Sequence, residues 1–113
     1  DLNLAREVMG PVIELPSQRL TIDAIQRATA KHFSLKLTDL KGSKRHKAVV
    51  VPRMIAMALA RKHTESSYPE IGRMFGGRDH STVISACKRV KWWLSIDPRV
   101  PTDVQAIEEL LGR

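Results

Sequence analysis

The stretch SYPEIGRMFGGRDHSTV, residues 67–83, decides the fold. Ser66 or Ser67 is suited to cap a helix, and apolar residues three to four positions apart then predict one short helix. The pair Gly76-Gly77 ends that helix, and a second helix follows. We therefore expect a helix-turn-helix, with its first helix over residues 67–75, its turn over 76–78 and its second helix over 79–96.

Helical spacing continues outward on both sides of this stretch, and no segment alternates as a strand would. Thr21 is suited to cap one helix, and Thr38 is suited to cap a short helical turn that Gly42 ends. Pro52 is compatible with a core helix only within its first turn. These signals predict further helices over residues 22–33, 38–41 and 49–63, and from Pro101 onward. The fold class that we expect is a compact all-α domain.

The basic charge is concentrated in the middle of the chain. Among 113 residues, 19 Lys and Arg oppose 12 Asp and Glu, which gives a formal net charge of +7. Residues 41–91 hold twelve of the basic and three of the acidic residues, a net of +9, whereas the remainder has a net of −2. Such a concentration points to a polyanionic partner such as nucleic acid.

The predicted second helix has two different faces. Val83, Cys87, Val90 and Leu94 share one side by helical spacing, which predicts a core stripe. The other side carries Ser81, Ser85, Lys88, Arg89 and Trp92. Hydroxyl groups and cations in one stripe suit the base edges and phosphates of a DNA major groove. The sequence assigns no role to Trp92. For the two cations, an ordinary solvated face is the alternative.

The residues that open the second helix can each bind DNA. Asp79 can accept a hydrogen bond from a cytosine amino group, and His80 can donate to purine acceptors or to a phosphate. Ser81 or Thr82 can bind a phosphate through the hydroxyl group or contact a thymine methyl group. The simpler alternatives are that Asp79 only caps the helix and that His80 is a solvated histidine.

Four residues outside that helix are further candidates for DNA contact. Arg45 lies on a loop that cannot enter a major groove already filled by a helix, so we expect it in the adjacent minor groove, where A·T-rich segments concentrate negative potential. Arg53 and Arg61 lie two turns apart on the core helix and could flank the major groove. Pro69 could touch a thymine methyl group or a sugar. The alternatives are a solvated loop for Arg45, a surface charge for Arg53 and a plain helix start for Pro69.

Several segments closely resemble the C-terminal domain of the DnaA family, the bacterial chromosomal replication initiators. They are FGGRDHSTV at residues 75–83, PEIG at 69–72 and PRMIAMAL at 52–59. The resemblance extends from about residue 20 to residue 96. It implies two parts, a connecting helix over residues 1–19 that follows the end of an ATPase domain, and a helix-turn-helix DNA-binding domain over residues 20–113.

The resemblance implies sequence-specific, monomeric binding to double-stranded DNA at the DnaA boxes of a replication origin, in support of the initiation of chromosome replication and its regulation. Carried over by position, the major-groove residues are Arg53, Arg61, Pro69, Asp79, His80, Ser81, Thr82, Ala86 and Arg89. The minor-groove residue is Arg45. Phosphate contacts are expected from Lys44, Lys47, Arg78, Ser85 and Lys88. Ser81 stands where the family more usually has Thr, which removes a methyl group from any thymine contact there.

Catalysis and metal binding find no support in the sequence. No Gly-x-x-x-x-Gly-Lys-Ser/Thr segment is present, so we expect no enzyme activity, and ATP and Mg would bind the ATPase domain of the family. Four histidines and one cysteine have no metal-binding spacing, so we expect no metal or other cofactor. Oligomers of the full-length family would form through the same ATPase domain.

Two other functions compete with the DnaA-like one. A dimeric transcription repressor would share the helix-turn-helix, but no spare apolar heptad offers a dimer surface. The segment before residue 19, broken at Gly10-Pro11, could contact acidic phospholipids, although its charge fits such a role poorly. Nothing resembles a signal peptide or a membrane helix, and Cys87 has no partner for an internal disulfide. We expect a cytoplasmic, nucleoid-associated bacterial protein.

Overall fold

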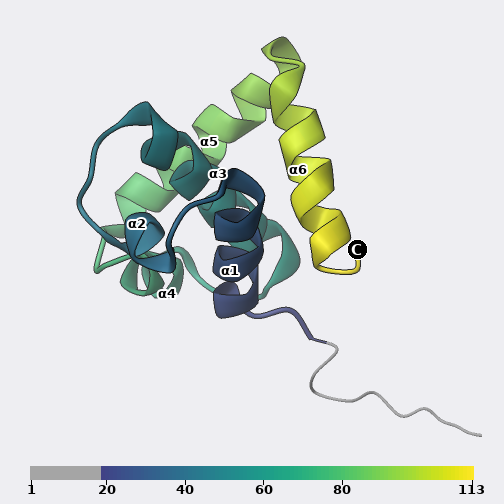
Figure 1. Cartoon of the computed structure of the whole chain (residues 1–113). Coiled ribbons are helices and arrows are strands. Elements are labelled where there is room, and N and C mark those ends of the chain that lie inside the picture. Colours follow the sequence, from purple (N-terminus) through teal and green to yellow (C-terminus); the bar gives the residue numbers. More distant parts are fainter. Residues whose placement is uncertain (1–18) are drawn as a thin grey trace, which may run out of the picture.

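The computed structural model describes residues 19–113, and within them it contains six α-helices and no strand (Figure 1). The helices are α1 (Ile22–Phe33), α2 (Leu37–Lys41), α3 (Lys47–His63), α4 (Tyr68–Met74), α5 (His80–Ile96) and α6 (Arg99–Leu110). The all-α fold class is therefore confirmed. The predicted helix that breaks at Gly10-Pro11 lies outside the described residues, and the domain division at residue 19 stays a prediction.

The long helix α3 lies at the centre of the described domain, in contact with α1, α2, α4 and α5. Apolar side chains of these helices form one core, whose largest fully buried members include Ile25, Ile55, Ile71 and Phe75. Helix α6 packs against α1 and α5 and adds the buried Ile107 to the same core (Figure 1). Burial of this apolar surface is the main favourable term in folding such a domain.

Side chains cap the helices α1 and α4 at their starts. The Thr21 hydroxyl accepts a hydrogen bond from the Ala24 amide at 3.0 Å, as predicted. At α4 the Ser67 hydroxyl accepts from the Glu70 amide at 3.2 Å, and the Glu70 carboxylate accepts from the Ser67 amide at 2.8 Å. This reciprocal pair satisfies two backbone donors, so Ser67 and not Ser66 is the cap.

Three predicted helix starts are wrong. Helix α2 begins one residue before Thr38, which lies inside the helix and does not cap it. The Asp39 carboxylate fixes this start, because it accepts a hydrogen bond from the Lys36 amide at 3.0 Å. Helix α6 begins two residues before Pro101, directly after the break at residues 97 and 98. The third wrong start is that of α3.

Helix α3 begins at Lys47, two residues earlier than its apolar pattern indicates. The Val50 amide already donates to the His46 carbonyl at 2.8 Å. Pro52 therefore lies past the first turn, contrary to the prediction, and its ring nitrogen cannot donate to the Ala48 carbonyl. Because Ala48 is exposed, water can satisfy that carbonyl, and the helix continues through the proline.

Polar contacts as well as apolar ones hold α6 against the other helices. His32 Nε2 lies 2.8 Å from a carboxylate oxygen of Asp103, and His63 Nε2 lies 2.6 Å from one of Glu108. The Lys62 ammonium lies 2.8 Å from the same Glu108 oxygen. Burial raises the pKa of Glu108, but the hydrogen bonds from Lys62 and His63 outweigh it and hold that pKa below its ordinary value.

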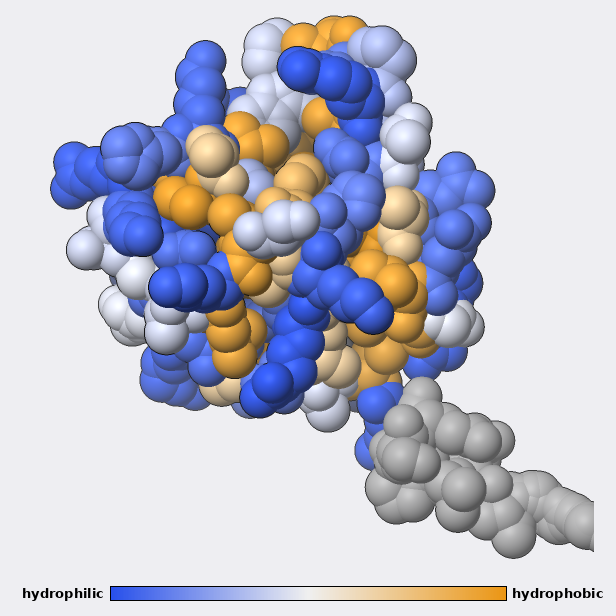
Figure 2. All heavy atoms as spheres, viewed as in Figure 1, coloured by the Kyte–Doolittle hydropathy of each residue, from blue (hydrophilic) through white to orange (hydrophobic). Residues whose placement is uncertain are grey.

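Some apolar side chains remain at the surface. On the face drawn in Figure 2, hydrophilic side chains border the apolar ones. The large hydrophobic residues that stay exposed are Met74, Trp92, Leu94, Ile96 and Leu110. The predicted place of Leu94 in the core is therefore wrong. Figure 1 shows the C-terminal end of α5 reaching beyond α3 toward the start of α6. There Leu94 is exposed, whereas its neighbour Trp93 is partly buried against the core.

Candidate nucleic-acid interface

Helices α4 and α5 form the helix-turn-helix, and two glycines make its turn possible. Gly76 and Gly77 both adopt positive φ angles, 83° and 77°, which favour glycine. A Cβ atom on Gly76 would lie 2.1 Å from the Lys41 carbonyl oxygen. A Cβ atom on Gly72 would lie 2.0 Å from the Arg78 carbonyl oxygen. The turn therefore packs directly against the end of α2, and larger residues do not fit at these two contacts.

Asp79 and His80 lie together at the start of α5. Asp79 occupies the N-cap position, but its side chain makes no capping hydrogen bond. Its carboxylate instead accepts a hydrogen bond from the Ser81 hydroxyl and lies 3.3 Å from His80 Nδ1. The hydrogen bond from Ser81 is the largest influence that lowers the pKa of Asp79. The Asp79 and His80 side chains are 66% and 58% exposed, so both can reach a ligand.

The two faces of α5 are largely those that the sequence predicts. Val83 and Val90 are buried and Cys87 is half-buried. The opposite stripe consists of Ser81, Ser85, Lys88, Arg89 and Trp92, all exposed. Trp92 is 57% exposed and continues this stripe one turn beyond the two cations. Helix α5 thus presents a polar and basic surface along most of its length.

A hollow of about 300 Å³ lies between α3 and the first turns of α5. Its lining comprises Val50, Arg53, Met54, Met57, Arg78, Ser81, Thr82, Ser85 and Ala86. Ala86 retains only 1% exposure, so a base could touch it only by reaching into this hollow. A DNA contact at Ala86 stays a prediction.

Arg53 is buried, which contradicts its interpretation as a surface charge. Only 5% of the residue is exposed, and three nitrogens of its side chain donate to backbone carbonyls. Nε donates to Leu40 at 3.0 Å, Nη1 to Lys44 at 3.0 Å and Nη2 to Asp39 at 2.7 Å. Burial, followed by the charge of Arg78, lowers the pKa of Arg53. Its contact with the major groove stays a prediction, and the three nitrogens already donate to carbonyls within the protein.

Other predicted contact residues also hold the protein together. Arg78 donates to the Phe75 carbonyl and, at 2.5 Å, to the Gly42 carbonyl. The Lys44 ammonium lies 3.0 Å from the Asp39 carboxylate. A phosphate contact from Lys44 would therefore compete with this ion pair.

Arg61 joins α3 to the segment that follows it. Its guanidinium donates to the Ser66 carbonyl at 3.0 Å and lies over the Tyr68 ring, 4.2 Å from the ring centre. The side chain is nevertheless exposed, and Pro69, beside Tyr68, is exposed as well. Both stay candidates for DNA contact.

The loop between α2 and α3 carries Arg45, and Lys47 follows as the first residue of α3. Arg45, His46 and Lys47 are exposed, and no hydrogen bond or ion pair of the Arg45 side chain occurs within residues 19–113. The loop lies beside the helix-turn-helix, because Arg78 in the turn donates to the Gly42 carbonyl. The structure therefore brings Arg45 to the side of the molecule from which α5 begins.

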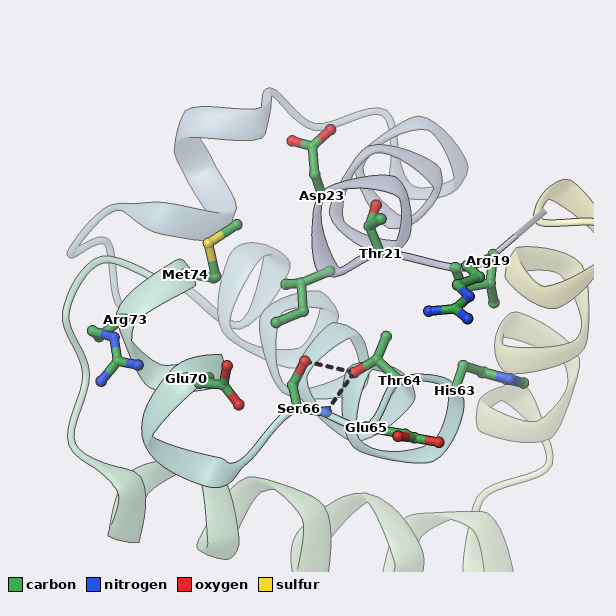
Figure 3. Close-up of a pocket in the computed structure, with 12 residues that line it drawn as sticks. Arg19, Thr21, Asp23, His63, Thr64, Glu65, Ser66, Glu70, Arg73 and Met74 are labelled. Carbon is green, nitrogen blue, oxygen red and sulfur yellow. Dashed lines mark hydrogen bonds between the residues drawn. The ribbon is translucent and has the colours of Figure 1, made fainter. Parts of the chain in front are cut away.

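A second and larger hollow contains none of the predicted site residues. It measures about 840 Å³ and lies among the start of α1, the segment between α3 and α4, and α4 itself (Figure 3). Figure 3 shows hydrogen bonds between Thr64 and Ser66, which are two of the residues that line it. Acidic and basic side chains, including Asp23, Glu70 and Arg73, line it together. Such mixed charge does not favour a DNA backbone, so we do not include this hollow in the interface.

Comparison with known proteins decides the family. Residues 22–90 match the family model described as the bacterial dnaA protein helix-turn-helix. The chain belongs to this family. It is 48% identical over 108 residues to the chromosomal replication initiator protein DnaA of Geobacter sulfurreducens, which covers 96% of this chain and 24% of that protein. The DnaA protein of Cereibacter sphaeroides is 36% identical over 110 residues, which covers 97% of this chain and 24% of that protein.

Membership of the DnaA family confirms the resemblance and the helix-turn-helix. The chain spans about a quarter of the length of the curated relatives that it matches. The matched module is a DNA-binding helix-turn-helix of replication initiators. None of the helices within residues 19–113 is long and apolar enough to cross a membrane.

Proposed function

We propose that this chain binds double-stranded DNA sequence-specifically, at the DnaA boxes of a bacterial replication origin, and thereby supports and regulates the initiation of replication. The observation that most supports this proposal is that two elements able to contact DNA lie close together. They are the exposed stripe of α5 and the loop with Arg45. Arg78 joins them by its bond to the Gly42 carbonyl. A helix in the major groove and a loop arginine in the adjacent minor groove need this proximity.

In this proposal, one group of interface residues contacts bases and another binds phosphates. Bases in the major groove would be contacted from the start of α5 and its neighbours, by Arg61, Pro69, Asp79, His80, Ser81, Thr82, Ala86 and Arg89. Phosphates would be bound by Lys44, Lys47, Ser85 and Lys88. The domain would bind as a monomer. The binding of ATP and Mg and the formation of oligomers would belong to the rest of the initiator. Any phospholipid contact would be made by residues 1–18. The protein would act at the nucleoid.

A footprint on origin DNA tests this function. Hydroxyl-radical cleavage of a duplex that carries several DnaA boxes, with and without the protein, measures which sugars are shielded. We expect shielding over each box, including the minor groove beside it, and none over the spacers. Uniform shielding along the duplex would show binding without sequence preference and would overturn the proposal.

Lys88→Ala is expected to weaken binding to a DnaA box and to a scrambled duplex by the same factor. Lys88 is exposed on α5, and a phosphate contact carries no sequence information. The slope of log affinity against log salt should become shallower by about 0.9. Fluorescence anisotropy at several salt concentrations measures both effects. Lys31→Ala, which removes an exposed lysine from α1, is the matched control and should change neither. A loss confined to the box would contradict the phosphate role.

Arg45→Ala is expected to weaken binding to the box by about tenfold or more, because a minor-groove contact is lost. Exchange of A·T for G·C pairs beneath the loop should reproduce this loss in the wild type, since it adds an amino group to the groove. The same exchange should have little effect on the variant. If wild type binds the exchanged duplex as tightly as the original, Arg45 does not enter the minor groove.

A further inference from the structure

The loop that carries Arg45 has few contacts of its own. Residues 42–46 form no helix, and the side chains of residues 43–46 are exposed. A loop left free to move loses conformational freedom when it binds, and that loss weakens binding. What holds the backbone of this loop in place therefore matters for a contact made from its tip.

Arg53 holds both ends of the segment that leads to Arg45. Its guanidinium donates to the carbonyls of Asp39 and Leu40 in α2 and to that of Lys44 in the loop. Lys44 directly precedes Arg45, so one of these bonds fixes the peptide unit that leads into Arg45. Because the residue is only 5% exposed, these bonds are shielded from competing water.

Arg78 holds the same loop from the helix-turn-helix. It donates to the Gly42 carbonyl in the loop and to the Phe75 carbonyl at the end of α4. Gly76 lies against the Lys41 carbonyl so closely that no Cβ atom fits between them. The turn and the loop are thus joined by a hydrogen bond and by direct backbone packing.

Burial of the Arg53 and Arg78 guanidinium groups costs free energy unless carbonyl oxygens accept hydrogen bonds from them. Burial lowers the pKa of Arg53 and of Arg78, and the Arg78 charge also disfavours the charged form of Arg53. Five donated hydrogen bonds to carbonyl oxygens offset this cost. Two arginines that served only to bind phosphates would instead keep their guanidinium groups exposed to water.

We propose that Arg53 and Arg78 are positioning residues, which fix the backbone of residues 42–46 against the helix-turn-helix and so act on DNA through Arg45. This inference rests on the proposed function and departs from the expectation that Arg53 contacts the major groove and Arg78 a phosphate. Residues in α3 and in the turn thereby set the spacing between the minor-groove contact and the major-groove helix.

A double-mutant cycle tests the inference. Arg53→Lys keeps the charge, but a single ammonium cannot serve three carbonyls in the planar arrangement of a guanidinium. In the wild-type background, Arg53→Lys should weaken binding to a DnaA box by about tenfold. In an Arg45→Ala background it should weaken binding by less than about twofold, because the contact that it positions is already gone. An equal loss in both backgrounds would show that Arg53 acts independently of Arg45, and would overturn the inference.

A second readout separates positioning from a loss of folding. Arg53→Lys should reduce the preference for A·T over G·C pairs beneath the loop, whereas a general loss of folded protein would weaken both duplexes alike. Arg78→Lys, at the less buried site, is the second variant and should give the same dependence on Arg45. Lys31→Gln is the control, and its effect should be the same in both backgrounds. If wild type does not prefer the box over a scrambled duplex, the proposed function fails; if it does and the cycles are additive, only this inference fails.

Discussion

Phe75→Ala is expected to lower the free energy of unfolding by about 3–5 kcal/mol, the usual cost of removing a large aromatic side chain from a core. Phe75 is fully buried, and it ends α4 directly before the glycine turn. Its loss leaves a cavity in the core that the helices share. Urea unfolding followed by circular dichroism measures the change.

The neighbouring residue provides the control for this prediction. Met74→Ala removes a side chain of similar length that is 37% exposed, and it should cost less than about 1 kcal/mol. The Met74 carbonyl, which accepts a hydrogen bond from Gln26 at 2.7 Å, is kept in the variant. Similar losses for the two variants would mean that the helix-turn-helix does not depend on the core contact of Phe75.

His80→Ala and Asp79→Ala are expected to cost about 1–3 kcal/mol each on a DnaA box, which is roughly five- to 150-fold in affinity, and much less on a scrambled duplex. Both side chains are exposed at the start of α5, where a recognition helix reads bases. Fluorescence anisotropy with both duplexes measures the losses. Equal losses on the two duplexes would assign the two residues to non-specific contacts.

Stability measurements make the Asp79 variant more informative. The Asp79 carboxylate does not cap α5, so Asp79→Ala should lower the free energy of unfolding by less than about 0.5 kcal/mol, below the usual cost of a lost cap. Loss of DNA binding without loss of stability would then be a direct effect on base contact. Ser95→Ala, an exposed position near the end of α5, is the matched control and should bind both duplexes as wild type does.

Much of the fold could be predicted from the sequence because local signals set it. The Thr21 cap, the apolar spacing of α1 and the positive φ angles of Gly76 and Gly77 act over a few residues. The basic segment over residues 41–91 could likewise be predicted, because a count of charged residues is enough to find it. The helix start at Lys47 could not be predicted because Lys47 and Ala48 precede the apolar spacing, which begins only at Val49.

The orientation of long side chains could not be predicted in this way. Helical spacing places Arg53 on α3, but it does not show that the guanidinium turns inward to the carbonyls of α2. Leu94 follows the same periodicity as Val90, yet it is exposed because α5 extends beyond its neighbours. Both outcomes depend on where the neighbouring helices end in three dimensions. The residues close to Arg53 and Leu94 in the sequence do not determine this.

Titration of the wild-type protein against one DnaA box and a scrambled duplex of equal length and composition tests the central claim most directly. The measurement is fluorescence anisotropy at two salt concentrations, about 50 and 200 mM. We predict that the box binds about 10³-fold more tightly than the scrambled duplex, and that added salt weakens both because phosphate contacts are shared. Equal affinity for the two duplexes at both salt concentrations would contradict sequence-specific binding by the helix-turn-helix.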